Sequence, residues 1–217
     1  DATAVFEVDM TGIVRRRIAV REEFRHRTGV DLTFLPFAIK AAVEALVQFP
    51  AVNVSVAAEG ILAFRHIHIG VAVAVDGGRN PGTDGLVVPV LHHADRLSVA
   101  GIARAVADLA ARARTGTLQP DELNGGTFTV NNTGAIGSII STPIIPLPQA
   151  AIMTTEAIVK RPVVLTDGEG NDSIAIRSMM YTCLTFDHRA FDGLTAGRFM
   201  AHVKQWLESI GPVIDLY

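Results

Sequence analysis

Apolar residues recur every three or four positions in three stretches of the chain, which is the spacing of one face of an α-helix. The strongest stripe starts at Thr33 and closes at residues 49–50, where a proline stops the helix. Ser98 and Thr11 are of the residue types that cap helix N-termini, so we expect helices from Ser98 to about residue 115 and from Thr11 towards residue 26. The third stripe, residues 194–209, predicts a helix that turns these side chains inward: Phe199, Met200, Val203, Trp206 and Leu207.

Shorter apolar and β-branched runs between the helices have the length of strands and are bounded by turn-forming residues. Strands are expected approximately at residues 6–10, 52–56, 61–64, 67–75, 86–91, 127–131, 150–155, 163–165 and 174–186. Residues 76–85 are typical of a polar hairpin loop, and residues 133–148 form a segment broken by Gly and Pro. Helices interspersed with runs of strands predict one mixed α/β domain, not a doubly wound parallel fold.

The composition is rich in apolar residues. Of the 217 residues, 49% are hydrophobic and 19% are charged, and the mean hydropathy is +0.33. No segment approaches the roughly 20 consecutive apolar residues that a membrane-spanning helix needs, so no membrane partner is expected. We expect a large core together with apolar surface buried against other subunits. The net charge of −3 and the isoelectric point near 6.2 argue against nucleic-acid binding.

Cysteine and histidine content bears on the compartment and on metal binding. Cys183 is the single cysteine, so no intrachain disulfide can form, and a reducing compartment such as the cytoplasm is expected. No signal or transit peptide is expected at the N-terminus. His66, His68 and the pair His92–His93 suggest a zinc site, but no acidic or cysteine ligand completes the pattern, so we expect no metal.

A cluster of ionisable residues follows the most apolar predicted strand. Asp187, His188, Arg189 and Asp192 lie within six residues of one another, between that strand and the last helix. Loop positions at strand ends are where catalytic side chains project from a rigid scaffold. A polar turn explains the same short pattern, so the residues alone leave catalysis and a plain turn both open.

Motifs along the rest of the chain favour catalysis. In order they are LTFLPFAIKAA at 32–42, GLVVPV at 85–90, GGTFTV at 125–130, PII at 143–145, PQAA at 148–151, IVKRP at 158–162, FDHR at 186–189 and DG at 192–193. Together they resemble the catalytic domain of the dihydrolipoyl acyltransferases, the core components of 2-oxo acid dehydrogenase complexes. These are relatives of chloramphenicol acetyltransferase, and the resemblance implies an α/β (α+β) fold of that type, with a mixed β-sheet flanked by helices.

The resemblance implies acyl transfer between the dihydrolipoamide thiol of a lipoyl domain and coenzyme A. A thiol with a pKa near 8.5 is mostly protonated at neutral pH, so a general base is needed, and His188 fills that role. The tetrahedral oxyanion needs a hydrogen-bond donor. The family commonly has Ser or Thr two residues after the equivalent of Thr129, where this chain has Asn131. Asn131 is our predicted donor because its amide donates hydrogen bonds, and Thr133 is an alternative.

Other site residues are implied by the same resemblance. Asp192 is expected to support the turn that carries His188 by pairing with Arg15, Arg16 or Arg17. Ser141 and Thr142 are expected to line the coenzyme A passage, with a plain loop as an equal alternative. The Asn-Asn-Thr-Gly sequence after Val130 is similar to the branched-chain type of Gram-positive bacteria, so the acyl group is expected to be branched. A pyruvate- or 2-oxoglutarate-type acyltransferase, or a stand-alone coenzyme A-dependent O- or N-acetyltransferase, are the alternatives.

The resemblance also implies how the chain is organised and assembled. Residues 1–217 are expected to form a single catalytic domain, with lipoyl and peripheral-subunit-binding domains upstream. A homotrimer is expected, with active sites at subunit boundaries, either alone or built into a larger cage. Expected partners are the lipoyl domain, a decarboxylase/dehydrogenase component and dihydrolipoamide dehydrogenase. The apolar tail, residues 210–217, is expected either to contact other trimers or to be a simple terminal extension.

Overall fold

The chain forms four α-helices and eleven strands in the described residues 1–75, 85–211 and 215–217 of the computed structural model. The helices are α1 (Thr11–Thr28), α2 (Leu35–Gln48), α3 (Val99–Thr115) and α4 (Gly193–Ser209). The strands are β1 (Ala2–Asp9), β2 (Val54–Ala57), β3 (Gly60–Ala63), β4 (Ile69–Val71), β5 (Val73–Val75), β6 (Gly85–Val87), β7 (Val90–Leu91), β8 (Phe128–Asn132), β9 (Ala151–Thr155), β10 (Val159–Thr166) and β11 (Asp172–Phe186). Four short 3-10 turns are η1 (Pro50–Val52), η2 (Ala94–Arg96), η3 (Pro120–Leu123) and η4 (Thr133–Ile136).

Seven strands make one mixed sheet, in the order β1-β11-β9-β8-β4-β7, with β10 paired to β11 off this path. Strands β4, β8 and β9 run parallel to one another, whereas β1, β9 and β10 are antiparallel to β11. Two-stranded pairs β2–β3 and β5–β6 complete the strands. The mixed sheet confirms the predicted fold class.

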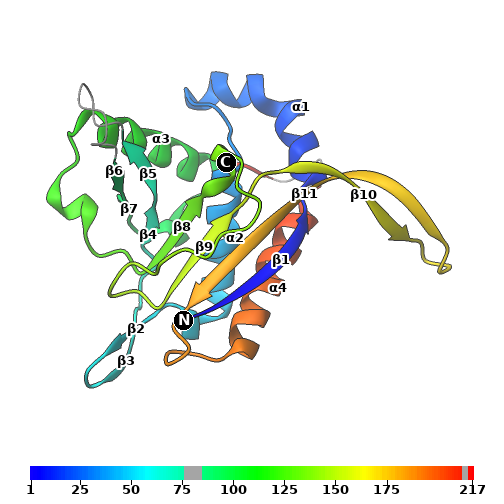
Figure 1. Ribbon diagram of the computed structural model, residues 1–217. Helices are drawn as coiled ribbons and strands as arrows, with labels where there is room; N and C mark the ends of the chain where they lie inside the picture. Colours follow the sequence, from blue (N-terminus) through cyan, green and yellow to red (C-terminus); the bar gives the residue numbers. More distant parts are fainter. Residues whose placement is uncertain (76–84, 212–214) are drawn as a thin grey trace.

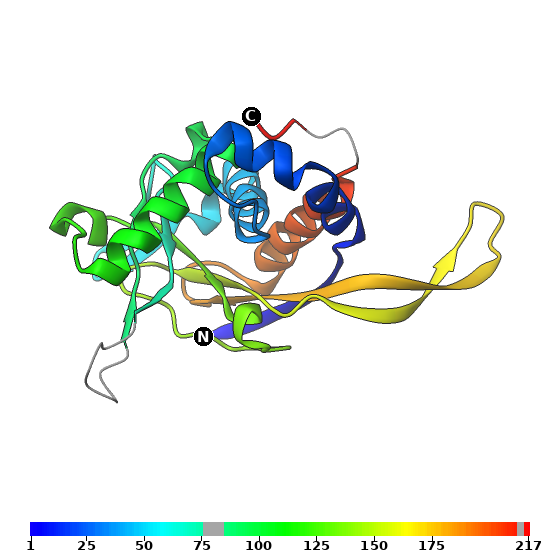
Figure 2. The same cartoon turned by 90° about the horizontal axis from the view of Figure 1, so that it is seen from above.

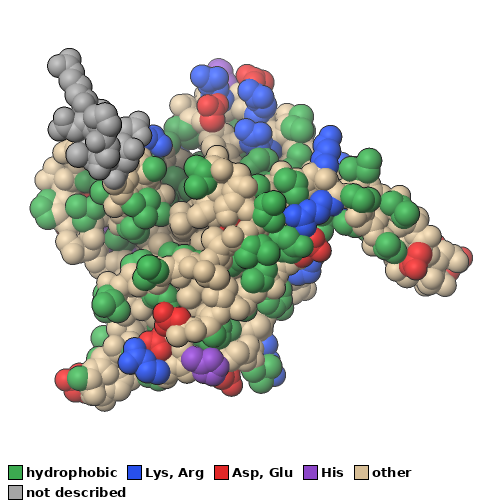
Figure 3. Space-filling view, viewed as in Figure 1, with side chains coloured by type: hydrophobic (Ala, Val, Ile, Leu, Met, Phe, Trp, Pro, Cys, Tyr) green, Lys and Arg blue, Asp and Glu red, His purple; other side chains and the backbone are tan. Residues whose placement is uncertain are grey.

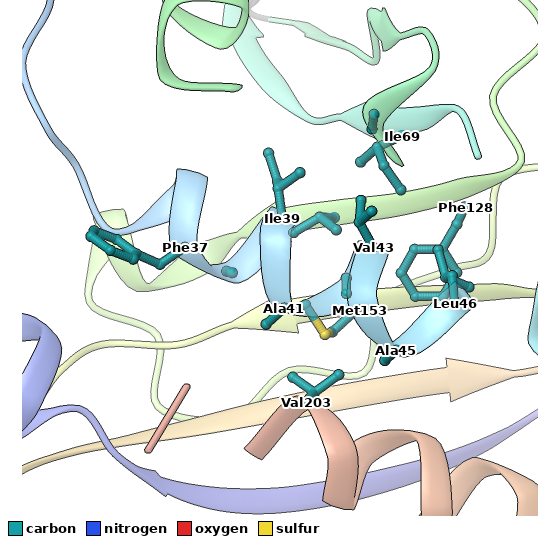
Figure 4. Packing of buried hydrophobic residues seen from close by; sticks show 14 of the residues in the cluster. Phe37, Ile39, Ala41, Val43, Ala45, Leu46, Ile69, Phe128, Met153 and Val203 are labelled. Atoms are coloured by element: carbon teal, nitrogen blue, oxygen red, sulfur yellow. The ribbon is translucent and has the colours of Figure 1, made fainter. Parts of the chain in front are cut away.

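The helices lie on one side of the sheet (Figures 1 and 2). Helix α2 is the centre of this layer and contacts α3 and α4. Its buried side chains, among them Phe37, Ile39 and Val43, belong to one core cluster with Val203 of α4 and the sheet residues Phe128 and Met153 (Figure 4). The core therefore anchors β8, β9 and β11, whose ends carry the predicted site residues, on a rigid helical layer.

A long hairpin projects from this body. Strand β10 and the first half of β11 pair from Val159↔Met179 to Thr166↔Asp172 and extend away from the helices (Figures 1 and 2). Apolar side chains on it are exposed, including Ile174 at 80% and Ile176 at 71%. An isolated two-stranded hairpin is marginally stable in water, so this arm lacks the packing partner it needs within one chain.

Two local expectations differ from the structure. Thr11 is the first residue of α1 and not its cap: its hydroxyl accepts a hydrogen bond from Ser178 N at 2.9 Å. The single strand expected at 67–75 is divided into β4 and β5, and the expected loop at 76–85 lies outside the described residues except for Gly85. Ser98, by contrast, is confirmed as the α3 cap, accepting from Gly101 N at 3.1 Å.

The described end of the tail packs on its own chain. Leu216 is buried and its carbonyl accepts a hydrogen bond from Ala100 N at 2.7 Å. The ring of Tyr217 stacks on Phe24, and the Arg27 guanidinium lies 3.5 Å from its centroid. These contacts favour the terminal-extension interpretation of the tail. Within the described residues, no helix is long and apolar enough to cross a bilayer.

Candidate active site

His188 lies in the turn that joins β11 to α4, where the chain leaves the strand between β1 and β9. The turn is fixed at its start, because Asp187 N donates to Ala150 O at 2.8 Å and Ala190 N donates to Asp187 O at 2.9 Å. Side-chain hydrogen bonds from Arg189 lower the pKa of Asp187 to about 2, so the two form an ion pair across the turn. This pairing leaves the histidine between them free to project.

The His188 side chain rests on aromatic rings and faces solvent. Its ring centroid is 5.6 Å from that of Phe186, which in turn stacks on Phe191 at 5.1 Å. His188 is exposed, and within the described residues its ring nitrogens take part in no hydrogen bond. An imidazole held on a rigid support with unoccupied nitrogens can accept a proton from a bound ligand.

Asp192 caps the helix that follows His188. Its carboxylate accepts from Thr195 N at 2.8 Å, and its pKa is lowered by this backbone hydrogen bond and by the side chain of Thr195. Within one chain Asp192 lies far from the start of α1, so the predicted ion pair with Arg15, Arg16 or Arg17 stays a prediction. Asp192 is exposed and lies beyond the β11 end that pairs with Ala2, whereas α1 starts after Asp9 at the other end of β1.

Asn131 lies at the opposite end of the sheet from His188. It sits near the end of β8, level with Thr154 on β9 and, through Thr154, with Cys183 on β11. From Cys183 to Phe186 the strand advances roughly 10 Å, and the two strand spacings between β8 and β11 add roughly 10 Å sideways. One chain therefore does not bring its own His188 and Asn131 together.

A buried carboxylate lies beside the Asn131 strand end. Glu156 is 2% exposed and accepts hydrogen bonds from the hydroxyls of Thr133 at 2.6 Å, Ser141 at 2.5 Å and Thr154 at 2.9 Å. Burial raises its pKa, but the hydroxyls of Ser141, Thr133, Ser138 and Thr154 together lower the pKa below its ordinary value. The glutamate is therefore ionised at neutral pH.

The hydrogen bonds of Glu156 bear on the roles predicted for Thr133, Asn131 and Ser141. The Thr133 hydroxyl donates to Glu156, which favours Asn131 over Thr133 as a donor to a ligand. The Ser141 hydroxyl also points inward to Glu156 and Thr154, whereas Thr142 is exposed. Sequence analysis missed Glu156 itself. The sequence feature that could have identified it is a glutamate directly after the buried strand β9. An ionised side chain at such a position needs hydrogen-bond partners.

An apolar cavity of about 520 Å³ opens next to Asn131. The polar and charged side chains Asp31, Thr33 and Arg114 contribute to its wall. Asn131, Asn132 and Thr133 also line it, and the remaining lining is apolar and mostly small: Leu35, Pro36, Val71, Ala72, Val73, Ala74, Leu86, Ala103, Val106, Ala107, Ala110, Ala135 and Ile136. Such a lining suits an aliphatic group better than a charged one.

The four predicted zinc candidates do form a histidine cluster. The ring centroids of His68 and His93 are 4.7 Å apart, and those of His68 and His92 are 4.8 Å apart. The pKa of His68 is lowered by burial and then by its histidine neighbours. Over residues 1–75, 85–211 and 215–217, no group of three or more His, Cys, Asp or Glu is arranged to hold a metal ion. Cys183 is fully buried, and burial raises the pKa of its thiol.

The fold is that of chloramphenicol acetyltransferase. A solved structure of that enzyme matches with a TM-score of 0.59 at 16% identity, over 95% of this chain and 87% of that chain. This likeness defines the structural class of the protein and nothing finer. The chain belongs to the family described as 2-oxoacid dehydrogenases acyltransferase (catalytic domain), whose sequence model matches residues 1–214.

Curated relatives include components of pyruvate, branched-chain alpha-keto acid and 2-oxoglutarate dehydrogenase complexes. The dihydrolipoyllysine-residue acetyltransferase component of the pyruvate dehydrogenase complex of Mycobacterium tuberculosis is 49% identical over 208 residues, covering 95% of this chain and 36% of that protein. The lipoamide acyltransferase component of the branched-chain alpha-keto acid dehydrogenase complex of Bacillus subtilis is 44% identical over 216 residues, covering 100% of this chain and 48% of that protein. The chain thus spans a third to a half of the length of these relatives.

Solved structures of the same family match closely. A crystal structure of a probable dihydrolipoamide acetyltransferase from Listeria monocytogenes has a TM-score of 0.90 at 44% identity, over 100% of this chain and 88% of that chain. The atomic structure of the cubic core of a pyruvate dehydrogenase multienzyme complex has a TM-score of 0.86 at 31% identity, over 96% and 82%. Family and fold therefore agree.

Proposed function

We propose that the protein transfers an acyl group between the dihydrolipoamide thiol of a lipoyl domain and coenzyme A, as the core of a 2-oxo acid dehydrogenase complex. The observation that carries the proposal is the exposed His188 imidazole, held on a rigid turn in a chain of this acyltransferase family. The same proposal places lipoyl and peripheral-subunit-binding domains upstream of this chain. It also includes a cytoplasmic location, with a decarboxylase/dehydrogenase component and dihydrolipoamide dehydrogenase as partners.

His188 acts as the general base in the proposed mechanism. The neutral imidazole takes the proton of the coenzyme A thiol while the sulfur attacks the thioester carbonyl of the acylated dihydrolipoamide. The carbonyl π electrons move to oxygen, and the Asn131 amide donates a hydrogen bond to that oxyanion. When the intermediate collapses, the carbon–sulfur bond to dihydrolipoamide breaks and the departing sulfur takes the proton back from the imidazolium. The reverse reaction uses the same groups.

The proposed site forms between two copies of the chain. Because His188 and Asn131 lie at opposite ends of one sheet, a site with both needs His188 from one subunit and Asn131 from its neighbour. Such head-to-tail contacts close into a ring, here a homotrimer, which we propose as the unit of an isolated trimer or of a larger cage. An ion pair of Asp192 with the α1 arginines would then also cross this boundary.

Exposed apolar surface supports this assembly. In the 133–148 segment, Ile136 is 89% exposed, Ile144 is 89% exposed and Leu147 is 92% exposed. Hydrophobic side chains also gather along the projecting arm and at its base (Figure 3). Extensive exposed apolar surface of this kind is typical of a protein–protein interface.

We propose a branched acyl group such as isobutyryl as the cargo. The small apolar side chains of the cavity beside Asn131 support an aliphatic acyl chain, and the Asn-Asn-Thr-Gly sequence is similar to the branched-chain type. The test compares acetyl-CoA, isobutyryl-CoA and succinyl-CoA as donors to dihydrolipoamide. A preference for acetyl-CoA would reassign the chain to the pyruvate type, and a preference for succinyl-CoA to the 2-oxoglutarate type.

The reaction class is tested with the His188→Ala variant. Without the base we expect the rate of acyl transfer to dihydrolipoamide to fall about 10²–10⁴-fold, while the oligomer stays intact. An unchanged rate would show that His188 is not the base. A wild-type chain that acylates a panel of alcohols and amines but no dihydrolipoyl compound would instead be a stand-alone O- or N-acetyltransferase.

A further inference from the structure

Glu156 is a buried anion that the mechanism above does not use. It follows β9 directly, and the neutral hydroxyls of Thr133, Ser141 and Thr154 are among the groups that donate hydrogen bonds to it. A carboxylate accepts hydrogen bonds only, so each of these hydroxyls must donate its proton to it. Burial of an ionised carboxylate is costly unless such donors offset it, so the cluster is a built arrangement and not a chance contact.

The three hydroxyls come from the three segments around Asn131. Thr133 is two residues beyond Asn131, where β8 turns into η4. Thr154 is the β9 neighbour of Asn131 in the parallel ladder. Ser141 comes from the apolar 133–148 segment. One carboxylate therefore joins the turn after β8, the end of β9 and the loop that carries Ser141.

Backbone packing tightens the same junction. Gly134 lies so close to β9 that a Cβ atom on it would meet the Glu156 carbonyl carbon at 2.2 Å and oxygen at 2.3 Å. Ala157 N also donates to Ser138 O at 2.8 Å. The turn after Asn131 is thus pressed against Glu156 through the main chain and tied to it through Thr133.

We propose that Glu156 is a positioning residue for the oxyanion donor. Its carboxylate holds the Asn131 strand end in place and keeps the Thr133 proton away from the reacting carbonyl, so that Asn131 alone donates there. The proposal rests on the role of Asn131 in the proposed function. A small misplacement of a donor lowers the rate by up to about 10²-fold, which makes the effect measurable.

The experiment measures kcat and KM of the full chain with dihydrolipoamide and the acyl-CoA that the wild type uses best. Glu156→Gln keeps the shape of the side chain and removes its charge, and we expect kcat to fall about tenfold with little change in KM for acyl-CoA. Thr133→Val should lower kcat similarly, because Val has the shape of Thr without the hydroxyl. Thr133→Ser should restore it. Glu169→Gln, at an exposed glutamate on the arm, is the matched control and should behave as wild type.

A double-mutant cycle separates positioning from a general loss of structure. Asn131→Ala alone should lower kcat by about 10²–10³-fold, and adding Glu156→Gln to it should cause no further loss. Full additivity of the two losses would overturn the proposal, as would wild-type kcat in both Glu156→Gln and Thr133→Val. If Glu156→Gln does not fold, the Val and Ser variants of Thr133 carry the test. If the wild type is active and Asn131→Ala is unimpaired, Asn131 is not the oxyanion donor and this proposal fails. If the wild type never acylates dihydrolipoamide, the proposed function itself fails.

Discussion

At the residue scale, the side chains on either side of His188 leave its imidazole available to accept a proton. Asp187 and Arg189 pair with each other, and their carboxylate and guanidinium leave the imidazole without a competing ion pair. Asp192 then starts α4 by accepting from Thr195 N. The charged cluster in the sequence is thus one projecting histidine and three residues that shape its turn.

Because Asp192 caps α4, we expect a modest loss of stability when its side chain is shortened to alanine. Asp192→Ala removes the acceptor for Thr195 N and should lower the unfolding free energy by about 1 kcal/mol. Asp192→Asn keeps a good N-cap and should retain most of that stability. Urea unfolding at one fixed protein concentration measures both variants. A loss above about 3 kcal/mol for Asp192→Ala would instead indicate a buried ion pair.

The Asp187–Arg189 pair predicts a pH dependence of stability. The folded-state pKa of Asp187, about 2, is lower than its ordinary value of 3.8. The stabilisation is therefore present above about pH 4 and is lost as the pH falls towards 2. Asp187→Asn lacks this titration, so the difference in urea midpoint between wild type and variant should shrink between pH 5 and pH 2. A constant difference over that range would contradict the assigned pKa.

At the element scale, the helices and most strands could be predicted because each has a local signal. Ser98 and the stripe after it define α3, and the α2 stripe ends at its proline, as expected. The projecting arm could not be predicted, because the apolar patterns of β10 and β11 do not show that these strands extend beyond the rest of the sheet. The opposite placement of His188 and Asn131 depends on the sheet order, which no local pattern contains. Glu156 was missed because its hydroxyl partners are up to 23 positions away along the chain.

The junction of η4 with β9 predicts a glycine requirement at position 134. A Cβ atom there would overlap the Glu156 main chain, so Gly134→Ala should displace the turn after Asn131 and lower both kcat and the melting temperature. Gly168→Ala is the matched control, since a Cβ atom at that glycine meets nothing within 4 Å and it should leave both quantities unchanged. A fully active Gly134→Ala variant would show that the turn position is not critical.

At the scale of the whole molecule, the exposed apolar surface and the divided site lead to the same assembly. Ile144→Glu and Leu147→Glu place a charge in the segment proposed as the subunit contact, and we expect both to dissociate the oligomer in analytical ultracentrifugation. Because both side chains are exposed in one chain, the fold of the subunit should persist by circular dichroism. Leu123→Glu changes an exposed leucine of η3, outside that segment and the arm, and should leave the oligomer intact.

Mixed oligomers test the divided site directly. Chains with His188→Ala and chains with Asn131→Ala are each expected to be nearly inactive alone. When the two are unfolded, mixed in equal amounts and refolded together, about a quarter of the boundaries combine an intact His188 from one chain with an intact Asn131 from the other. We therefore expect roughly a quarter of the wild-type activity to return. A site contained within one chain recovers nothing on mixing, because every chain then lacks one of the two groups.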